Sequence, residues 1–539
     1  MMKKTIKKLL AALLAVAMVC AMAIPAFAYD TKEDLNTKHE YDAFQIFKGD
    51  VTGNDTDGFK ISNVTWGKNI PHPEDFLEKL TEDSTIGGEF KTDFTPQEAV
   101  AVISKWHDSD NNSIAFARFV CNYIYTDSNA NREPVIQGGH TGGFELPMAG
   151  YYLIVDTSPF SGGDSYHAYN SFLLKVNQKN YHVQITPKVV KPTVKKEVYD
   201  NDDGSSSGDN NGWGSSADHA INEEFQFRLI ATLPASENNG HAYDYYDKYS
   251  VIFHDTLSDG ITYDRPDSVV IKSNGKTYVI PNDSSKYTIG LESQNYLVVK
   301  IPDVKACAKD AGFDLNDGAT ITVTYTAHLN ENAAVNGSAE NKNSVRLQYS
   351  NNPRPDGEYW GYTPNYTPES EVYVYTYQLN NTKYHDEVNE NNKLEGAGFR
   401  LYSDEACNNE IKLKKNNDGT YSRDFSTGAS GVEMISDNKG QFNVKGLDAG
   451  TYYLKETTPP AGYSACKVIP VTIKADHSRN DQVNLEGSNL TNDIVNIKAG
   501  GITLPSTGGI GTTIFYVVGG GLMVAAIVLL VTKKRMENK

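Results

Sequence analysis

The chain has 539 residues and a formal net charge of −18. We exclude a duplex-binding role because phosphate contacts need clustered Lys and Arg, and no basic run lies outside the two ends. The sequence has no H-E-x-x-H or G-x-S-x-G motif and no Cys pair at zinc spacing. We therefore expect no enzyme, no metal and no cofactor.

The first residues have the plan of a secretory signal peptide. An apolar run from Leu9 to about Ala23 is followed by Ala26-Phe27-Ala28, which supplies small residues at the cleavage subsites. The basic n-region that precedes the run contains Lys3, Lys4, Lys7 and Lys8. We expect residues 1–28 to be a signal peptide. The alternative, a membrane anchor, is disfavoured because the run is short.

Residues 29–187 combine helix and strand patterns. Thr95 to Glu98 forms a capping box with Pro96 at the first helical position, which predicts a helix that continues to Trp106. Further helices are predicted at residues 73–80 and 113–124. Strands are predicted at 151–155, 172–174 and along the alternating Tyr181, Val183 and Ile185.

Residues 188–371 are rich in strand patterns, with clean alternation at 320–325 and 345–349. Residues 200–216 are rich in Asp, Asn, Gly and Ser and predict a mobile loop. Its carboxylates could bind a cation, but they lack the ligand spacing of a calcium loop, so we favour a solvated loop.

Residues 372–500 open with the alternating run 372–377 and end with a strand at 493–497. Short strands, frequent turns and few long helices favour immunoglobulin-like sandwiches in series. We therefore predict a mostly β protein of tandem sandwich domains, the first with some helix. About 475 residues between the two ends suffice for three domains.

Five cysteines are few for an exported chain. Cys20 leaves with the signal peptide, and Cys121 and Cys307 fall in different domains. Cys407 and Cys466 fall in one domain and could form a disulfide. The chain must therefore be stabilised mainly in some other way.

Residues 504–539 carry the most specific motif. Leu504-Pro505-Ser506-Thr507-Gly508 precedes nineteen apolar residues, 513–531, and a basic tail. Nineteen helical residues reach roughly 29 Å, enough to cross the hydrocarbon core, and the tail would stay cytoplasmic. The arrangement resembles the cell-wall sorting signal of sortase substrates rather than an ordinary single-pass protein. The resemblance implies cleavage after Thr507, whose carbonyl passes as a thioester to an amine.

Residues 446–457, GLDAGTYYLKET, lead into PPAGY at 459–463. This resembles the E-box strand of Cna B-type pilin domains. In that family a lysine on the first strand and an asparagine on the last form an intramolecular isopeptide bond, promoted by the E-box glutamate. The resemblance implies that Lys383 and Asn496 form the linked pair and that Glu456 promotes the reaction. The alternative for Glu456 is a surface strand residue.

Three shorter motifs in the second segment, at residues 194–198, 253–257 and 343–351, resemble the isopeptide-forming middle domain of fimbrial backbone proteins. The resemblance implies Lys196 and Asn343 as the linked pair and Asp255 as the promoting carboxyl group. Structural polar residues are the alternative.

The chemistry explains these residue types. A lysine must be neutral to attack a carbonyl, and burial lowers its pKa. Burial raises the pKa of a carboxyl group, which can then protonate the amide and help ammonia leave. Holding amine and carbonyl in contact can supply roughly 7–11 kcal/mol of the barrier.

Residues 181–188, YHVQITPK, resemble the pilin motif at the end of the first domain, with threonine where the family usually has tyrosine. The resemblance implies that Lys188 attacks the Thr507 thioester of the next subunit, and Lys191 is its nearest competitor. Asp156 follows an E-box-like run, but no matched lysine and asparagine accompany it.

Together these resemblances imply a structural backbone subunit of a covalent pilus, secreted and anchored to the cell wall at the surface of a Gram-positive bacterium. The implied partners are a class C-type pilin sortase, the housekeeping sortase, identical subunits and peptidoglycan, with ancillary pilins and the host surface as further candidates. The alternatives are a monomeric wall-anchored adhesin, an ancillary pilin or, least favoured, a wall-active enzyme.

Overall fold

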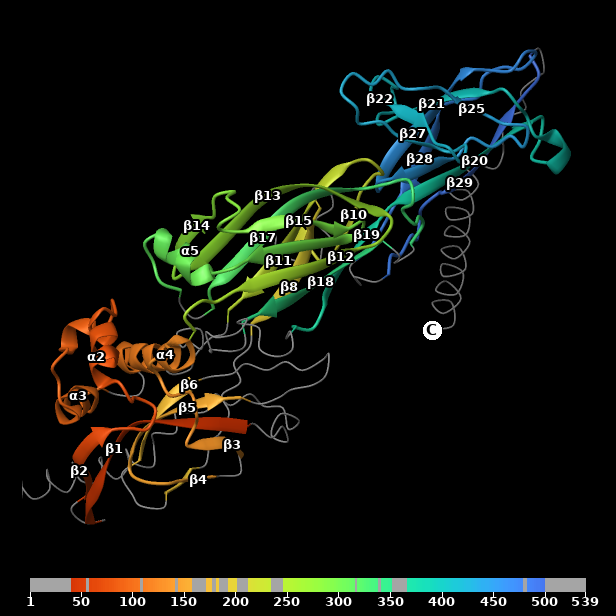
Figure 1. Ribbon diagram of the computed structural model, residues 1–539. Coiled ribbons are helices and arrows are strands. Elements are labelled where there is room, and N and C mark those ends of the chain that lie inside the picture. The colour runs from red at the N-terminus through yellow and green to blue at the C-terminus, as the bar shows by residue number, and fades with distance from the viewer. Residues whose placement is uncertain are drawn as a thin grey trace, which may run out of the picture. The chain divides into compact units, whose positions relative to one another are not determined.

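The structure is a computed structural model, and its elements are labelled in Figure 1. The residues it describes are 40–54, 58–106, 110–140, 144–157, 171–176, 181–183, 192–200, 212–233, 246–315, 318–337, 341–350, 366–477 and 482–499. The predicted signal peptide, the sorting motif, Lys188 and Lys191 lie outside these ranges. Within them, no helix has both the length and the apolar character to span a membrane.

The chain divides into two compact units. Unit 1 contains Met1–Tyr377, Gly446–Ala449 and Lys474–Gly487, and unit 2 contains Gln378–Lys445, Gly450–Ile473 and Ser488–Lys539.

The N-terminal part of unit 1, residues 40–183, has a five-stranded antiparallel sheet of order β2-β1-β5-β6, with β3 also on β1. Its strands are β1 Glu40–Asn54, β2 Gly58–Trp66, β3 Ile136–His140, β5 Gly150–Asp156 and β6 Ser171–Val176. β4 Phe144–Leu146 pairs with β7 Tyr181–Val183. All of β5 is buried, because Tyr151, Leu153 and Val155 pack in one hydrophobic cluster while Tyr152 and Ile154 pack in another.

The helices of this part are α2 Pro73–Thr81, η2 Gly87–Glu89, α3 Pro96–Ile103 and α4 Asn111–Thr126. The predicted capping box is confirmed, since the Glu98 N–H donates to Thr95 Oγ1 and the Thr95 N–H donates to Glu98 Oε2. Aromatic side chains of α2 and α4 pack edge-to-face, with the rings of Phe76 and Tyr123 5.0 Å apart. The helices predicted at 73–80 and 113–124 are also confirmed.

The middle part of unit 1, residues 192–375, is a sandwich of two six-stranded sheets of order β10-β19-β18-β12-β16-β15 and β14-β13-β17-β11-β8-β9. The first sheet contains β10 Ser216–Asp218, β12 Val251–Leu257, β15 Thr288–Ser293, β16 Tyr296–Ile301, β18 Lys342–Tyr349 and β19 Ser370–Tyr375. The second contains β8 Thr193–Tyr199, β9 Trp213–Gly214, β11 Glu224–Thr232, β13 Ile261–Ser273, β14 Lys276–Val279 and β17 Thr320–Leu329. One helix, α5 Val304–Asp310, is described here.

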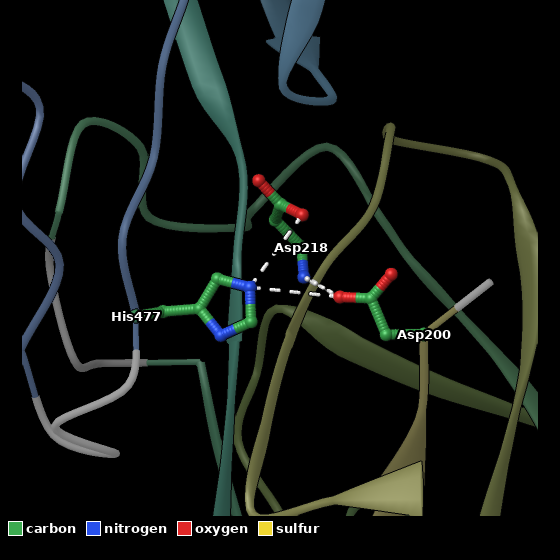
Figure 2. A group of neighbouring side chains, drawn as sticks. All are labelled: Asp200, Asp218 and His477. Atoms are coloured by element: carbon green, nitrogen blue, oxygen red, sulfur yellow. Dashed lines mark hydrogen bonds and ion pairs between the residues drawn. The ribbon is translucent and has the colours of Figure 1, made fainter. Parts of the chain in front are cut away.

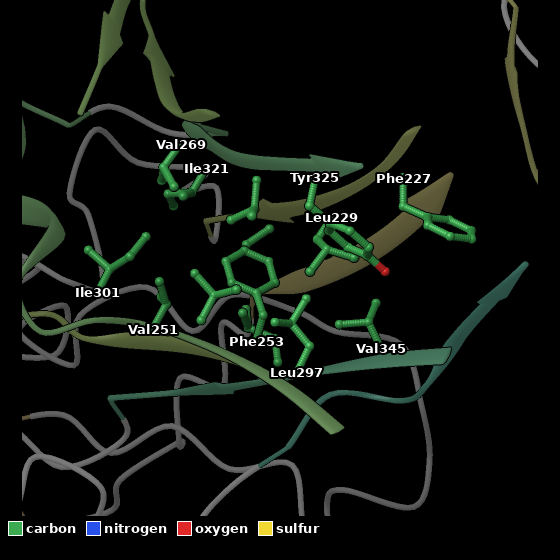
Figure 3. Close-up of a cluster of buried hydrophobic side chains, with 14 of the residues drawn as sticks. Phe227, Leu229, Val251, Phe253, Val269, Leu297, Ile301, Ile321, Tyr325 and Val345 are labelled. Atoms are coloured by element: carbon green, nitrogen blue, oxygen red, sulfur yellow. The ribbon is translucent and has the colours of Figure 1, made fainter. Parts of the chain in front are cut away.

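The core of the middle part is formed by side chains that alternate along these strands (Figure 3). β11 alternates buried and less buried residues over its whole length, which places Phe227 and Leu229 in the core. Phe253 and Val345 come from the other sheet. Period-two alternation is what a strand with one buried face requires, and it is the pattern seen in the sequence.

One boundary differs from the sequence analysis. The run 372–377 was expected to open the third segment, but β19 pairs antiparallel with β18 and parallel with β10 in the middle part. An alternating run shows that a strand forms, but not which sheet provides its hydrogen-bond partners.

Unit 2 consists mainly of two five-stranded sheets, of order β23-β24-β26-β20-β29 and β22-β21-β27-β28, with β25 also on β21. The first contains β20 Tyr377–His385, β23 Leu413–Lys415, β24 Tyr421–Arg423, β26 Val444–Leu447 and β29 Thr491–Asn496. The second contains β21 Gly398–Tyr402, β22 Glu410–Ile411, β25 Met434–Ile435, β27 Gly450–Thr458 and β28 Ile469–Ile473; a short helix, η4 Glu390–Asn392, follows β20. The predicted mostly β fold class is confirmed.

Candidate functional site

The first candidate site lies where β20 and β29 pair in parallel in unit 2. Lys383 is opposite Ile494 in the register, and Asn496 follows two residues later on the same face of its strand. The Lys383 ammonium donates to Asn496 Oδ1 at 2.6 Å and to the Ile494 carbonyl at 3.4 Å. The parallel register therefore places an amine against a side-chain amide 113 residues away in sequence.

A glycine turn fixes the backbone of Lys383. The Lys383 N–H donates to the Gly440 carbonyl at 2.7 Å, and Gly440 has a φ of +73°. A Cβ at Gly440 would lie 2.5 Å from the Lys383 carbonyl oxygen. Only glycine adopts this conformation at so close an approach without strain.

Glu456, on β27, reaches the other side of the amide. Asn496 Nδ2 donates to Glu456 Oε1 at 2.6 Å, and the Cys466 N–H donates to Glu456 Oε2 at 2.7 Å. Glu456 thus contacts the nitrogen of the Asn496 amide, and Lys383 contacts the oxygen of the same amide. The three predicted residues are brought together.

The site is buried and lies beside an aromatic ring. Lys383 is 0% exposed, Asn496 1% and Glu456 6%, and the ammonium lies 5.6 Å from the centre of the Phe399 ring. Burial lowers the pKa of Lys383, an effect that the nearby Glu456 carboxylate partly opposes. A neutral amine capable of nucleophilic attack is therefore more accessible here than in water.

The second candidate site lies between the two sheets of the middle part. Lys196 on β8 donates to both carboxylate oxygens of Asp255 on β12, at 2.7 Å each. Both side chains are fully buried. The ammonium also lies 5.0 Å from the centre of the Phe227 ring. β8 and β12 belong to opposite sheets, so this pair crosses the sandwich core.

Tyr325, on β17, connects the second site to its asparagine. Its hydroxyl donates to Asp255 Oδ2 at 2.7 Å and accepts from Asn343 Nδ2 at 2.7 Å and from Lys196 Nζ at 3.1 Å. Asn343 Oδ1 is buried and has no hydrogen-bond partner within the described part of the chain. Sequence reasoning missed Tyr325, whose only signal was an inward position in an alternating strand.

Burial perturbs both ionisable partners of the second site. Burial lowers the pKa of Lys196 to about 8, although Asp255 opposes the shift. Burial also raises the pKa of Asp255, against the effects of Lys196 and Tyr325. Both shifts favour the uncharged forms, a neutral amine and a protonated acid, which acyl transfer to an amine needs.

Cys407 and Cys466 do not form the disulfide that the sequence suggested, and both are free. Cys407 lies in a turn with a φ of +58° and contacts the Glu405 carbonyl, whereas Cys466 lies beside Glu456. Burial raises the pKa of the Cys466 thiol to about 12, and a protonated thiol is a poor nucleophile.

Two family models match the chain. Residues 378–488 match the SpaA prealbumin-like fold domain, and residues 496–538 match the LPXTG cell wall anchor motif. The first match contains Lys383 and Glu456, and the second begins at Asn496. The class is therefore that of a mostly β surface protein anchored to the cell wall. It carries a prealbumin-like domain of the SpaA type.

No curated protein matches the chain. Among solved structures, the T6 backbone pilin of Streptococcus pyogenes is 17% identical with a TM-score of 0.44, covering 86% of this chain and 96% of that one. The major pilin SpaD of Corynebacterium diphtheriae is 19% identical with a TM-score of 0.39, covering 70% and 83%. A C-terminal fragment of the major pilin GBS80 of Streptococcus agalactiae is 23% identical with a TM-score of 0.39, covering 57% and 99%.

Proposed function

We propose that the chain is the backbone subunit of a covalent surface pilus, stabilised by Lys383–Asn496 and Lys196–Asn343 isopeptide bonds. The observation that carries the proposal is the contact of Lys383 Nζ with Asn496 Oδ1 at 2.6 Å while Glu456 accepts from Asn496 Nδ2. Amine, amide and acid stand in the order that the reaction requires.

The internal reaction needs no cofactor, because the three side chains account for every bond and proton that changes. Lys383 Nζ, as a neutral amine, bonds to Asn496 Cγ, and the Cγ–Nδ2 bond breaks. Glu456 in its acid form protonates the leaving nitrogen and recovers a proton from the attacking amine, so ammonia is the only product released. At the second site Asp255 takes this role for Lys196 and Asn343.

Assembly would use a different amine. A pilin sortase would break the Thr507–Gly508 peptide bond and hold the Thr507 carbonyl as a thioester, which Lys188 of the next subunit would attack. The housekeeping sortase would pass the last subunit to peptidoglycan. Support comes from the match to the anchor motif and from the Pro-Lys pair that follows an alternating strand at the end of the first segment.

The polymer is tested by replacing one lysine at a time in the native host. We expect K188R to abolish the ladder of high-mass bands that survives hot detergent in wall extracts, because arginine cannot be acylated in place of lysine. K191R is the matched control and should leave the ladder intact. A ladder that survives K188R and disappears with K191R would show that Lys191, and not Lys188, supplies the linking amine. A wild-type protein without any ladder would favour a monomeric wall-anchored adhesin.

The second internal bond should form at a constant rate up to about pH 8 and more slowly above it. The reaction needs a neutral Lys196 beside a protonated Asp255, and this state holds one proton, as the buried ion pair does. Its population therefore does not change with pH until the pair loses that proton near the pKa of Lys196, about 8. Chain recovered unlinked from inclusion bodies can be refolded at pH 6, 7, 8 and 9 and followed by intact mass. A rate that rises tenfold per unit between pH 6 and 8 would contradict a protonated Asp255 in the reacting state.

A further inference from the structure

A buried group of three side chains lies outside both candidate sites. Asp200 follows β8, Asp218 ends β10, and His477 comes from the segment Lys474–Gly487, all within unit 1. The three side chains are 0% exposed. Figure 2 shows both carboxyl groups directed towards one edge of the imidazole ring. A solvated loop was expected over residues 200–216, and for the buried Asp200 and Ser216 this is wrong.

Ser216 determines which nitrogen of His477 carries a proton. Its Oγ lies 2.8 Å from the His477 carbonyl oxygen and 2.9 Å from His477 Nδ1. A hydroxyl has a single proton, and the carbonyl can only accept. Both contacts are hydrogen bonds only if Oγ donates to the carbonyl and Nδ1–H donates to Oγ. In the neutral ring Nε2 is then the nitrogen with the lone pair, and it faces the carboxylates.

The distances from His477 Nε2 to the two carboxylate groups fit ligands that share one ion better than they fit direct hydrogen bonds. Nε2 lies 3.6 Å from Asp200 Oδ2 and 3.8 Å from Asp218 Oδ1, beyond the usual 2.7–3.2 Å of an N–H···O bond. Donor atoms of all three residues lie within 4.8 Å of one another. Ligand bonds of about 2.1 Å place donors about 3.0–4.2 Å apart for angles between 90° and 180°.

We propose that Asp200, Asp218 and His477 bind a divalent transition-metal ion of the Zn²⁺ type. One imidazole nitrogen with two carboxylates suits this class, whereas Ca²⁺ takes six to eight oxygen ligands and Mg²⁺ keeps several waters. Ser216 serves as the outer partner that orients the ring through Nδ1, as such partners do at histidine ligands. The three side chains leave a fourth tetrahedral position for water.

The ion would connect chain regions that are remote in sequence. Ser216 and His477 are 261 residues apart, and Asp200 follows a strand of one sheet of the middle part whereas Asp218 ends a strand of the other. The unfolded chain does not hold these ligands together, so the free energy of binding contributes to folding of unit 1. Zinc should therefore raise the thermal stability of the protein.

A neighbouring group, His219, Glu223 and Asp448, makes a weaker candidate. His219 Nε2 lies 2.7 Å from the Tyr199 carbonyl oxygen, so it is the protonated nitrogen and only Nδ1 could bind an ion. Glu223 accepts from the Ala220 N–H and Asp448 from the Ala449 N–H. Glu223 is only partly buried, whereas all three members of the first group are buried, so this second group is the weaker candidate.

The test is metal content of the purified full chain, stripped with chelator and dialysed against Zn²⁺. We expect one Zn²⁺ per chain, a rise in the thermal midpoint, and visible d–d absorption with Co²⁺. H477Q should lose all three responses. The matched control is H254Q, which replaces a histidine that also contacts two side chains, Tyr296 and Gln348, and it should keep them. S216A should weaken zinc affinity by about 10–100-fold.

If H477Q does not fold, D218N preserves side-chain size and removes one ligand charge, and it too should lose the Co²⁺ absorption. The proposal is overturned if wild-type protein takes up no zinc above a blank, which would mean that a proton bridges the cluster. It is equally overturned if H477Q or D218N binds zinc like the wild type. None of these readouts depends on the isopeptide bonds.

Discussion

Replacing Glu456 by alanine is expected to leave Lys383 and Asn496 unlinked, so the protein retains the ammonia that the wild type has lost. Glu456 Oε1 accepts from the leaving nitrogen at 2.6 Å, and alanine provides no group that can protonate it. The lost cross-link closes a loop of 113 residues, which by analogy with disulfides stabilises by about 4–5 kcal/mol. Intact mass and thermal unfolding measure both effects.

Two controls separate chemistry from packing. E456Q keeps the shape and the contact with Asn496 but cannot donate a proton in the same way, so it should also stay unlinked. E433A removes a nearby carboxyl group that accepts from Thr458 Oγ1 at 2.8 Å, and it should keep the wild-type mass deficit. The prediction fails if E456A shows the same mass deficit as the wild type, or if the wild type shows none.

The sequence predicted local elements well where a local signal defines them. Thr95 and Glu98 cap α3 through contacts three residues apart, so the capping box can be recognised in the sequence itself. β17 alternates because one of its faces packs in the core. β19 was assigned to the wrong segment because its partners, β18 and β10, are determined by tertiary pairing that alternation does not encode.

The candidate sites show the same division. Motif resemblance named Lys383, Asn496 and Glu456, and the structure brings them into contact, but neither their hydrogen bonds nor their burial could be obtained from spacing. Tyr325 could not be singled out, because nothing local distinguishes it from other inward tyrosines. Asp200 was misjudged because its loop composition predicts solvent exposure, whereas its burial depends on packing within unit 1.

Replacing Asp255 by alanine should remove the second bond and strongly destabilise the middle part. Lys196 Nζ contacts both oxygens of Asp255 at 2.7 Å, and both side chains are 0% exposed. Removing one partner of a buried pair leaves an uncompensated charge and costs about 3–5 kcal/mol. The expected result is a chain that is one ammonia heavier than the wild type. Its urea midpoint should lie below that of E456A if the cost of the stranded Lys196 charge exceeds the cost of losing the Lys383–Asn496 bond in E456A.

The double variant K196M/D255A tells the two causes of destabilisation apart. Methionine fills much of the lysine's volume without a charge, and apolar replacement of buried ion pairs is often neutral or stabilising. The double variant should therefore regain several kcal/mol relative to D255A and still lack the Lys196–Asn343 bond. If D255A retains the mass deficit of two lost ammonias, Asp255 does not promote the reaction. If the double variant is no more stable than D255A, the loss comes from the missing cross-link and not from the stranded ammonium.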